Sequence, residues 1–119
     1  MEIDFETDGP DTLPLEIGRS LFRVAQEALY NASKHSGVKR VEVRLQEGSG
    51  EIHLTISDLG KGFDLEAALR GKGLGLTSMR ERVRLVNGTI SIESKPMAGT
   101  TIHVRVPFRS EHGTRRAAG

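Results

Sequence analysis

The most informative segment of this chain is Gln26-Glu27-Ala28-Leu29-Tyr30-Asn31-Ala32-Ser33-Lys34-His35. It closes a helical run in which small or apolar residues recur at steps of three and four, namely Leu15, Gly18, Phe22, Ala25, Leu29 and Ala32. This spacing places them on one stripe of a helix that can lie on a sheet. Pro14 suits the first turn and Ser36-Gly37 is a stop signal, so we predict a helix from about Leu13 to about His35.

Three polar side chains of this helix, Glu27, Asn31 and Lys34, fall on one edge, because steps of four and seven residues rotate by roughly 40° and 20° from alignment. Taken alone, such a trio is an ordinary solvated helix edge. Asn31 argues for more, because asparagine is unfavourable inside a helix. A carboxylate and an amide oxygen one turn apart suit a hydrated divalent cation, which usually completes its shell with substrate phosphate.

The composition limits the kind of protein this can be. With 119 residues we expect one domain with a single core. The chain has no cysteine, which excludes disulfides and thiolate metal sites, and no apolar run near the ~20 residues of a membrane span. Seventeen Lys and Arg against sixteen Asp and Glu, with 4% aromatic residues, do not indicate a nucleic-acid surface. We therefore expect a soluble domain without nucleic-acid or membrane contact.

Alternating polar and apolar residues predict five strands, at residues 2–7, 41–45, 52–56, 90–92 and 102–106. The first is expected to be a half-buried edge strand, and Gly48-Ser49-Gly50 joins the second and third as a hairpin. A second helix has the apolar stripe Leu76, Met79, Val83 and Val86. It ends at Asn87-Gly88, a left-handed C-terminal signal. We expect the domain to span residues 1–108 and residues 109–119 to form a disordered tail.

Strand parity singles out Asp58 and Thr100. Asp58 is in step with the apolar residues of the third strand, and Thr100 with those of the fifth, so both meet the covered face of the sheet at strand ends. A buried carboxylate needs hydrogen-bond donors. They are either turn amides from Gly60 and Lys61, or a ligand amine that Thr100 helps to bind directly or through water.

Two glycine clusters favour the ligand: Asp58-Leu59-Gly60-Lys61-Gly62 after a strand, and Gly71-Lys72-Gly73-Leu74-Gly75-Leu76 before the second helix. Glycine lets backbone approach a ligand closely, and amides at a helix N-terminus favour phosphate. Either cluster alone is weak evidence. The second does not follow a strand, so it is no dinucleotide fingerprint, and the chain has no Walker glycine-lysine-serine or glycine-lysine-threonine sequence.

Four ordered blocks carry a family resemblance: Glu27-x-x-x-Asn31-x-x-Lys34-His35, Asp58-x-Gly60-x-Gly62, Gly73-Leu74-Gly75-Leu76 and Gly99-Thr100. Together they resemble the catalytic ATP-binding domain of sensor histidine kinases, in the GHKL ATPase superfamily. The sequences Asn-Ala-Ser-Lys-His-Ser at 31–36 and Gly-Leu-Gly-Leu-x-x-Met-Arg-Glu-Arg at 73–82 narrow it to kinases that pair with nitrate/nitrite-type response regulators. The resemblance covers residues 13–108, and four blocks in order make it specific.

The resemblance implies roles for the residues of the first helix. Asn31 would coordinate magnesium bridging the ATP phosphates, with Glu27 as a second metal ligand or an acid/base group. Lys34 and His35 would face the phosphates, although His35 could equally cap the helix C-terminus as a cation. Tyr30 either packs at the sheet edge or contacts the nucleotide.

The other blocks would bind the rest of ATP. Asp58 would bind the exocyclic amine of adenine, with Gly60 beside it, Gly62 allowing the base to approach, and Thr100 sharing the water network. Residues 63–72 would form a short lid. The triphosphate would be bordered by the backbone of Gly73, Leu74, Gly75 and Leu76.

The implied fold is α/β (α+β), a two-layer Bergerat-type sandwich with a mixed sheet of about five strands and about three helices on one face. The implied activity is a protein histidine kinase of a two-component system, which transfers the ATP γ-phosphate, with magnesium, to a histidine on dimerisation helices absent from this chain. Its partners would be those helices in a cytoplasmic homodimer and a cognate response regulator. Two alternatives stay open: a GHKL serine kinase of the anti-sigma type, and a nucleotide-binding interaction module without turnover.

Overall fold

The computed structural model describes residues 2–10, 12–36, 40–60 and 75–108. Its elements are β1 (Glu2–Asp8), α1 (Leu15–Asn31), the π-helical segment η1 (Ala32–Ser36), β2 (Arg40–Gly48), β3 (Glu51–Asp58), α3 (Leu76–Arg84), β4 (Thr89–Ser94) and β5 (Thr100–Pro107). The strands form one sheet in the order β1-β2-β3-β5-β4. β1 is parallel to β2, and the other neighbours are antiparallel.

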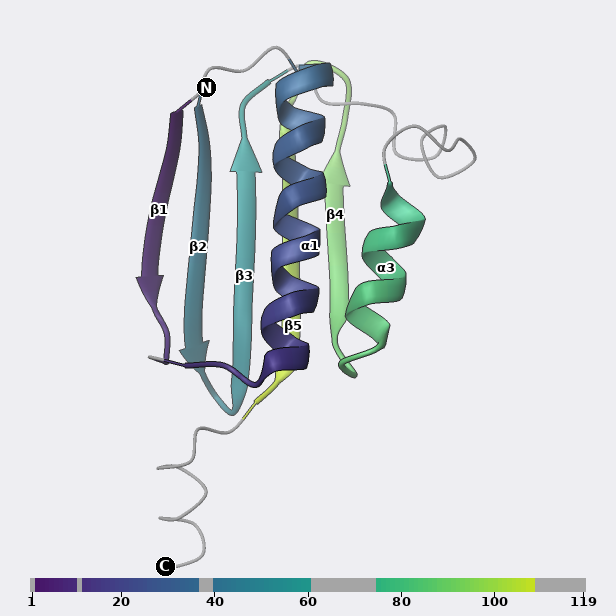
Figure 1. Ribbon diagram of the computed structural model, residues 1–119. Coiled ribbons are helices and arrows are strands. Elements are labelled where there is room, and N and C mark those ends of the chain that lie inside the picture. The colour runs from purple at the N-terminus through teal and green to yellow at the C-terminus, as the bar shows by residue number, and fades with distance from the viewer. Residues whose placement is uncertain (1, 11, 37–39, 61–74, 109–119) are drawn as a thin grey trace, which may run out of the picture.

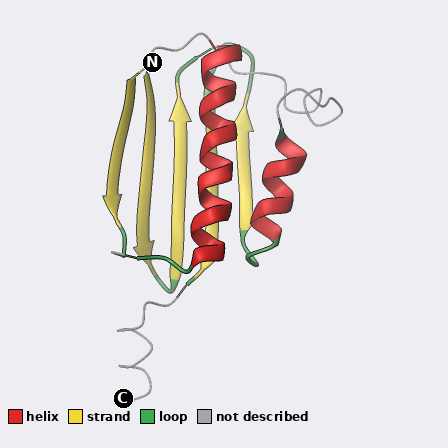
Figure 2. Cartoon of the chain, in the orientation of Figure 1, coloured by secondary structure: helices red, strands yellow, loops and turns green. Residues whose placement is uncertain are grey.

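The two α-helices form a second layer against the sheet. α1 lies over the middle strands and α3 lies beside α1 on the β4 side (Figure 1; Figure 2 shows helices in red and strands in yellow). The predicted sandwich with a mixed five-stranded sheet is confirmed, with two α-helices among the described residues. Within those residues, no helix combines the length and the apolar character that a membrane crossing requires.

The core lies between these layers. Every second residue of the central strands is buried, as alternation predicted: Val41, Val43, Ile52, Leu54, Ile56, Ile102, Val104 and Val106. From α3, Leu76, Met79 and Val83 are buried as predicted. Full burial of one such side chain stabilises the fold by about 1.5–3 kcal/mol, so this layer holds α1 and α3 on the sheet.

The predicted stripe of α1 was partly wrong. Leu15 and Phe22 are 67% and 61% exposed. The buried residues Leu21, Val24 and Ala28 lie one position before predicted members of the stripe, a rotation of about 100°. Two neighbouring apolar stripes have the same spacing on this helix, because α1 packs against both the sheet and α3, and spacing alone did not separate them.

The bounds of the first helix also differ from the prediction. α1 begins at Leu15 because Pro14 is extended, with φ −52° and ψ 141°. Pro14 acts as the N-terminal cap residue, and its carbonyl accepts the first helical hydrogen bond, from Gly18 N at 2.9 Å. After Asn31 the helix continues as η1 to Ser36, one residue beyond the predicted end.

Both predicted turns are confirmed. β2 and β3 are joined by a two-residue turn in which Ser49 and Gly50 have φ +56° and +74°, as a type I′ hairpin requires. The turn that follows α3 contains a left-handed Asn87 with φ +60°. There Gly88 N donates to Val83 O at 2.9 Å, which closes the helix in a Schellman-type cap.

β1 is an outer strand, as predicted, but it is not half-buried. Ile3 and Phe5 are 49% and 59% exposed, although they are in register with the buried Val41 and Val43. The reason is visible in Figure 1, where neither described α-helix extends over β1. Burial of an edge strand depends on what covers it, and β1 lies beyond that cover.

Candidate functional site

The predicted site residues lie at element ends that meet at one end of the fold. Asn31 is the last residue of α1, Asp58 the last of β3, and Thr100 the first of β5. Gly75 directly precedes α3. Figure 1 shows the end of α1 and the ends of β3 and β4 at the top of the molecule, with the start of α3 somewhat lower in the upper half. The topology therefore brings four separate segments of sequence to one place.

Asp58 and Thr100 are direct neighbours across the sheet. They are Cα partners in the β3–β5 ladder, and Thr100 is paired on its other side with Ser94 of β4. Parity predicted that the two residues share a face, and the register makes them adjacent. A carboxylate and a hydroxyl thus stand side by side at the end of the covered face.

Each of these side chains is held by a local hydrogen bond. Asp58 Oδ1 accepts the Gly60 amide at 2.8 Å, which is the turn bond expected as one of the two alternatives. The Thr100 and Ser94 hydroxyl oxygens are 2.8 Å apart, and the Ser94 hydroxyl donates to Gly99 O at 3.2 Å. Sequence reasoning missed Ser94, because its contact depends on how the β4–β5 turn folds.

Gly99 lets this turn reach the end of β3. Its φ is +80°, a conformation that costs other L-residues about 1–2 kcal/mol. A Cβ at this position would collide with the carbonyl oxygen of Asp58 and would lie 3.1 Å from the Leu59 Cα. Because only glycine fits, Gly99 allows the β4–β5 turn to pack against the end of β3, next to the ladder pair of Asp58 and Thr100.

Glu27 of α1 lies against the start of α3. Gly75 has φ +65°, and a Cβ there would be 2.6 Å from Glu27 Oε2. The half-buried carboxylate is therefore packed beside the residue that precedes Leu76, where the helix dipole favours negative charge. The Leu76 side chain is 4% exposed and belongs to the core, so only its backbone can border a ligand.

The three residues of the predicted helix edge differ in environment. Asn31 is buried at 9% exposure, Glu27 is half-buried and Lys34 is exposed. Lys34 Nζ lies 5.5 Å from the centroid of the Tyr30 ring, a cation–π distance. This contact gives Tyr30 a described partner within its own helix.

A small cavity separates α1 from α3 next to Glu27. Its volume is about 70 Å³, and its lining is Arg23, Gln26, Glu27, Ser78, Met79 and Arg82. Two guanidinium groups thus flank the one carboxylate of this cavity. Sequence reasoning did not single out Arg23, because its relevance depends on how the helices pack.

Several predicted residues fall outside the described part of the chain. They are Gly62, Gly73, Leu74, the lid at residues 63–72 and the side chain of His35. Residues 109–119, the predicted tail, also fall outside it. For these residues the predictions stand as made.

A second polar cluster lies on the opposite face of the sheet, which no described helix covers. His53 Nδ1 and His103 Nε2 are 3.1 Å apart, and Glu51 Oε1 is 3.4 Å from His53 Nε2. Both histidines lie at the polar positions of their alternating strands, and both are half-buried. Burial, helped by the charges of His53 and Arg105, lowers the pKa of His103 below its usual 6.5.

The sequence matches a family profile described as histidine kinase-, DNA gyrase B- and HSP90-like ATPase over residues 16–110. The signal transduction histidine-protein kinase/phosphatase DegS of Brevibacillus brevis is 37% identical over 110 residues, which are 92% of this chain and 28% of DegS. The oxygen sensor histidine kinase NreB of Staphylococcus carnosus is 46% identical over 93 residues, 78% of this chain and 27% of NreB. The chain thus spans about a quarter of the length of these relatives.

Solved structures agree on the fold. The histidine kinase domain of the blue-light activated histidine kinase EL346 from Erythrobacter litoralis matches with a TM-score of 0.71 at 22% identity, over 90% of this chain and 51% of that one. The Acinetobacter baumannii histidine kinase AdeS matches with a TM-score of 0.69 at 20% identity, over 92% and 56%. The chain therefore belongs to the histidine kinase-, DNA gyrase B- and HSP90-like ATPase family, and within it to the ATPase domains of sensor histidine kinases.

Proposed function

We propose that this domain binds ATP with magnesium and transfers the γ-phosphate to a histidine on a separate dimerisation helix. One observation carries the proposal: Asp58 with Thr100, and Glu27 with Asn31 and Gly75, lie at the same end of the fold. The first group suits a base and the second suits phosphates. Phosphoryl transfer needs this kind of positioning more than it needs covalent chemistry by the protein.

Asp58 is our candidate for the adenine contact. The Gly60 amide fixes its Oδ1 at 2.8 Å, and no hydrogen bond from the described residues reaches its Oδ2. Such an oxygen can accept an amine proton from the base without disturbing the turn. Thr100 stands beside it in the sheet and would share that contact directly or through water.

The phosphates would lie toward Asn31 and the start of α3. Asn31 and Glu27 are the oxygen donors that would hold magnesium, which commonly takes one or two protein ligands and completes its shell with water and substrate phosphates. Bound there, the ion would neutralise phosphate charge. Among the described residues, no group of three or more His, Asp or Glu side chains could hold a metal unaided, so this site would be completed by its substrate.

Glu27 has two possible roles that experiment separates. As a metal ligand it would lie in the coordination sphere with Asn31, and as a base it would take the proton of the attacking histidine. Glu27→Gln should weaken magnesium-dependent ATP binding in the first case. In the second case it should leave binding intact and stop transfer.

The names of the relatives support a proposal about partners. DegS is named a signal transduction histidine-protein kinase/phosphatase and NreB an oxygen sensor histidine kinase, so we propose a two-component system in which the kinase is a homodimer and a response regulator receives the phosphate. ATP is available in the cytoplasm, where we place the domain. The acceptor histidine would be presented by the helices of the same kinase.

Calorimetric titration of a non-hydrolysable ATP analogue, with and without magnesium, tests the proposal. Asp58→Asn should abolish binding, and Asn31→Ala should remove its magnesium dependence. His53→Gln, on the opposite face of the sheet, is the matched control and should bind normally. A folded chain that binds no nucleotide would contradict the proposal and support a non-enzymatic module that keeps the fold and acts through protein contacts alone.

The transfer step needs its own assay. Incubated with ATP and magnesium, the isolated chain should form no acid-labile phosphohistidine, because the acceptor is supplied by another segment. Adding the dimerisation helices of a related kinase should produce it on those helices. Phosphohistidine on the isolated chain would contradict this assignment, and phosphoserine on a protein partner would identify the anti-sigma type instead.

A further inference from the structure

Among the described residues, the outer edge of β1 has no pairing strand. β1 bonds to β2 through one edge, and no other strand of the described residues pairs with its second edge. The opposite outer strand, β4, has α3 alongside it (Figure 1). A strand with unpaired amides and carbonyls is a template for an added strand.

One side of β1 is apolar. Ile3 and Phe5 are in register with Val41 and Val43, which are only 0% and 5% exposed, whereas Ile3 and Phe5 are 49% and 59% exposed. The apolar surface of the core thus continues outward to the edge without cover from the described helices. An added strand would extend this surface and bury part of both side chains.

The other side of β1 is acidic. Its residues there are Glu2, Asp4, Glu6 and Asp8, and β2 adds Glu42 between Arg40 and Arg44. Arg40 pairs with Asp4, and Arg44 Nε lies 3.4 Å from Glu6 Oε2. Five carboxylates against two guanidinium groups leave a net charge of −3 on this side.

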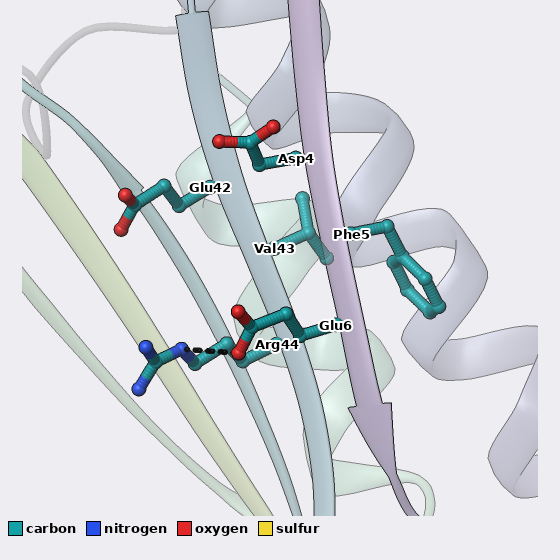
Figure 3. A pocket seen from close by; sticks show the side chains of 6 residues that line it. All are labelled: Asp4, Phe5, Glu6, Glu42, Val43 and Arg44. Atoms are coloured by element: carbon teal, nitrogen blue, oxygen red, sulfur yellow. Dashed lines mark ion pairs between the residues drawn. The ribbon is translucent and has the colours of Figure 1, made fainter.

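A hollow of about 300 Å³ lies on these two strands, lined by Asp4, Phe5, Glu6, Glu42, Val43 and Arg44. Figure 3 shows the carboxylates of Asp4, Glu6 and Glu42 around it, with Phe5 on the other side of β1. A basic side chain laid along the edge would therefore find several carboxylates within reach.

We propose that this edge binds an extended segment of a partner protein in which basic and apolar residues alternate. Main-chain hydrogen bonds would add the segment to the sheet as a sixth strand. Its apolar residues would cover Ile3 and Phe5, and its basic residues would face the acidic side chains on the other side of β1. A second copy of β1 fits poorly, because like charges would stand opposite one another. The carboxylates of Glu2, Asp4, Glu6 and Asp8 thus oppose pairing with a second copy of β1 and favour a partner segment with basic residues.

The probe is an acetylated and amidated peptide of alternating lysine and valine, seven residues long, added to the ¹⁵N-labelled chain. We expect amide shifts in β1 that weaken with salt, and none from a glutamate–valine peptide. A lysine–valine peptide with alternate amides N-methylated should not bind, because it cannot form the ladder. Equal binding by the N-methylated peptide would reduce the interaction to charge alone and overturn the proposal, as would shifts located away from β1.

Variants locate the contact on the chain. Asp4→Asn with Glu6→Gln should weaken peptide binding about tenfold, whereas Glu93→Gln on β4 should leave it unchanged. Phe5→Thr keeps strand propensity and both ion pairs, so it tests the apolar side if the double variant disturbs β1. Unchanged affinity in a folded Phe5→Thr variant and in the double variant would refute the assignment.

Discussion

Replacing Gly99 by alanine tests how closely the β4–β5 turn approaches β3. The variant has two costs: a left-handed alanine, about 1–2 kcal/mol, and a backbone shift to relieve the collision with Asp58 O, about 1–3 kcal/mol on the scale of overpacked cores. Alanine also restricts the unfolded chain, which offsets about 0.4–1 kcal/mol. Gly50→Ala is the matched control, because Gly50 also has a positive φ, +74°, but has no atom within 4 Å of a Cβ placed there.

The two variants therefore differ by the collision alone, and we expect Gly99→Ala to be less stable than Gly50→Ala by about 1–3 kcal/mol. Urea unfolding followed by circular dichroism measures this difference. Gly99→Ala should also weaken binding of the ATP analogue, because the turn positions Thr100 against Asp58, whereas Gly50→Ala should not. Equal destabilisation by the two variants would show that the approach of Gly99 to Asp58 O costs nothing, and full nucleotide affinity in Gly99→Ala would show that the turn does not position the site.

Two further predictions concern other parts of the molecule. Gly75→Ala should lower the free energy of unfolding only by the left-handed strain of about 1–2 kcal/mol, because the added Cβ meets the flexible end of Glu27. The folded variant should nevertheless transfer phosphate more slowly in an assay with added dimerisation helices. A folded variant with a normal transfer rate would argue against a role for this contact. In NMR spectra the pKa of His103 should lie below its usual 6.5. The folded chain then binds fewer protons than the unfolded chain near this pH. The stability that His103 contributes is therefore present above pH 6.5 and is lost as the pH falls through the lowered pKa. Replacing His53 by glutamine should move the pKa of His103 back toward 6.5, and an unchanged titration would exclude an influence of His53.

Most of the sheet was predictable from alternation, because one face is covered and the other is not. The period of two in β3 and β5 is enough to predict that Asp58 and Thr100 lie on the covered face. Alternation does not predict the register in which β3 pairs with β5, and it is this register that makes Asp58 and Thr100 direct partners. The exposure of Ile3 and Phe5 was missed for a related reason, since alternation reports a face and not whether a helix covers it.

For α1, the spacing of apolar residues was not enough to predict which face is buried. Two stripes one residue apart satisfy the same pattern, and only packing against both the sheet and α3 selects the one with Leu21 and Val24. The contact between Glu27 and Gly75 likewise requires α1 and α3 to be placed side by side. Ser94 depends on the left-handed Gly99 in the turn that follows it. Such contacts between distant segments carry no local signal in the sequence.

The ATP site is tested most directly by mapping the amide signals of the ¹⁵N-labelled chain while a non-hydrolysable ATP analogue and magnesium are added. We expect the signals of Gly60, Gly75 and Thr100, and those at the end of α1, to shift together with a single affinity. The signals of His53 and His103 on the opposite face should stay in place. A folded chain whose signals do not move, or move only on the open face or along β1, would contradict the claim that these element ends form an ATP site.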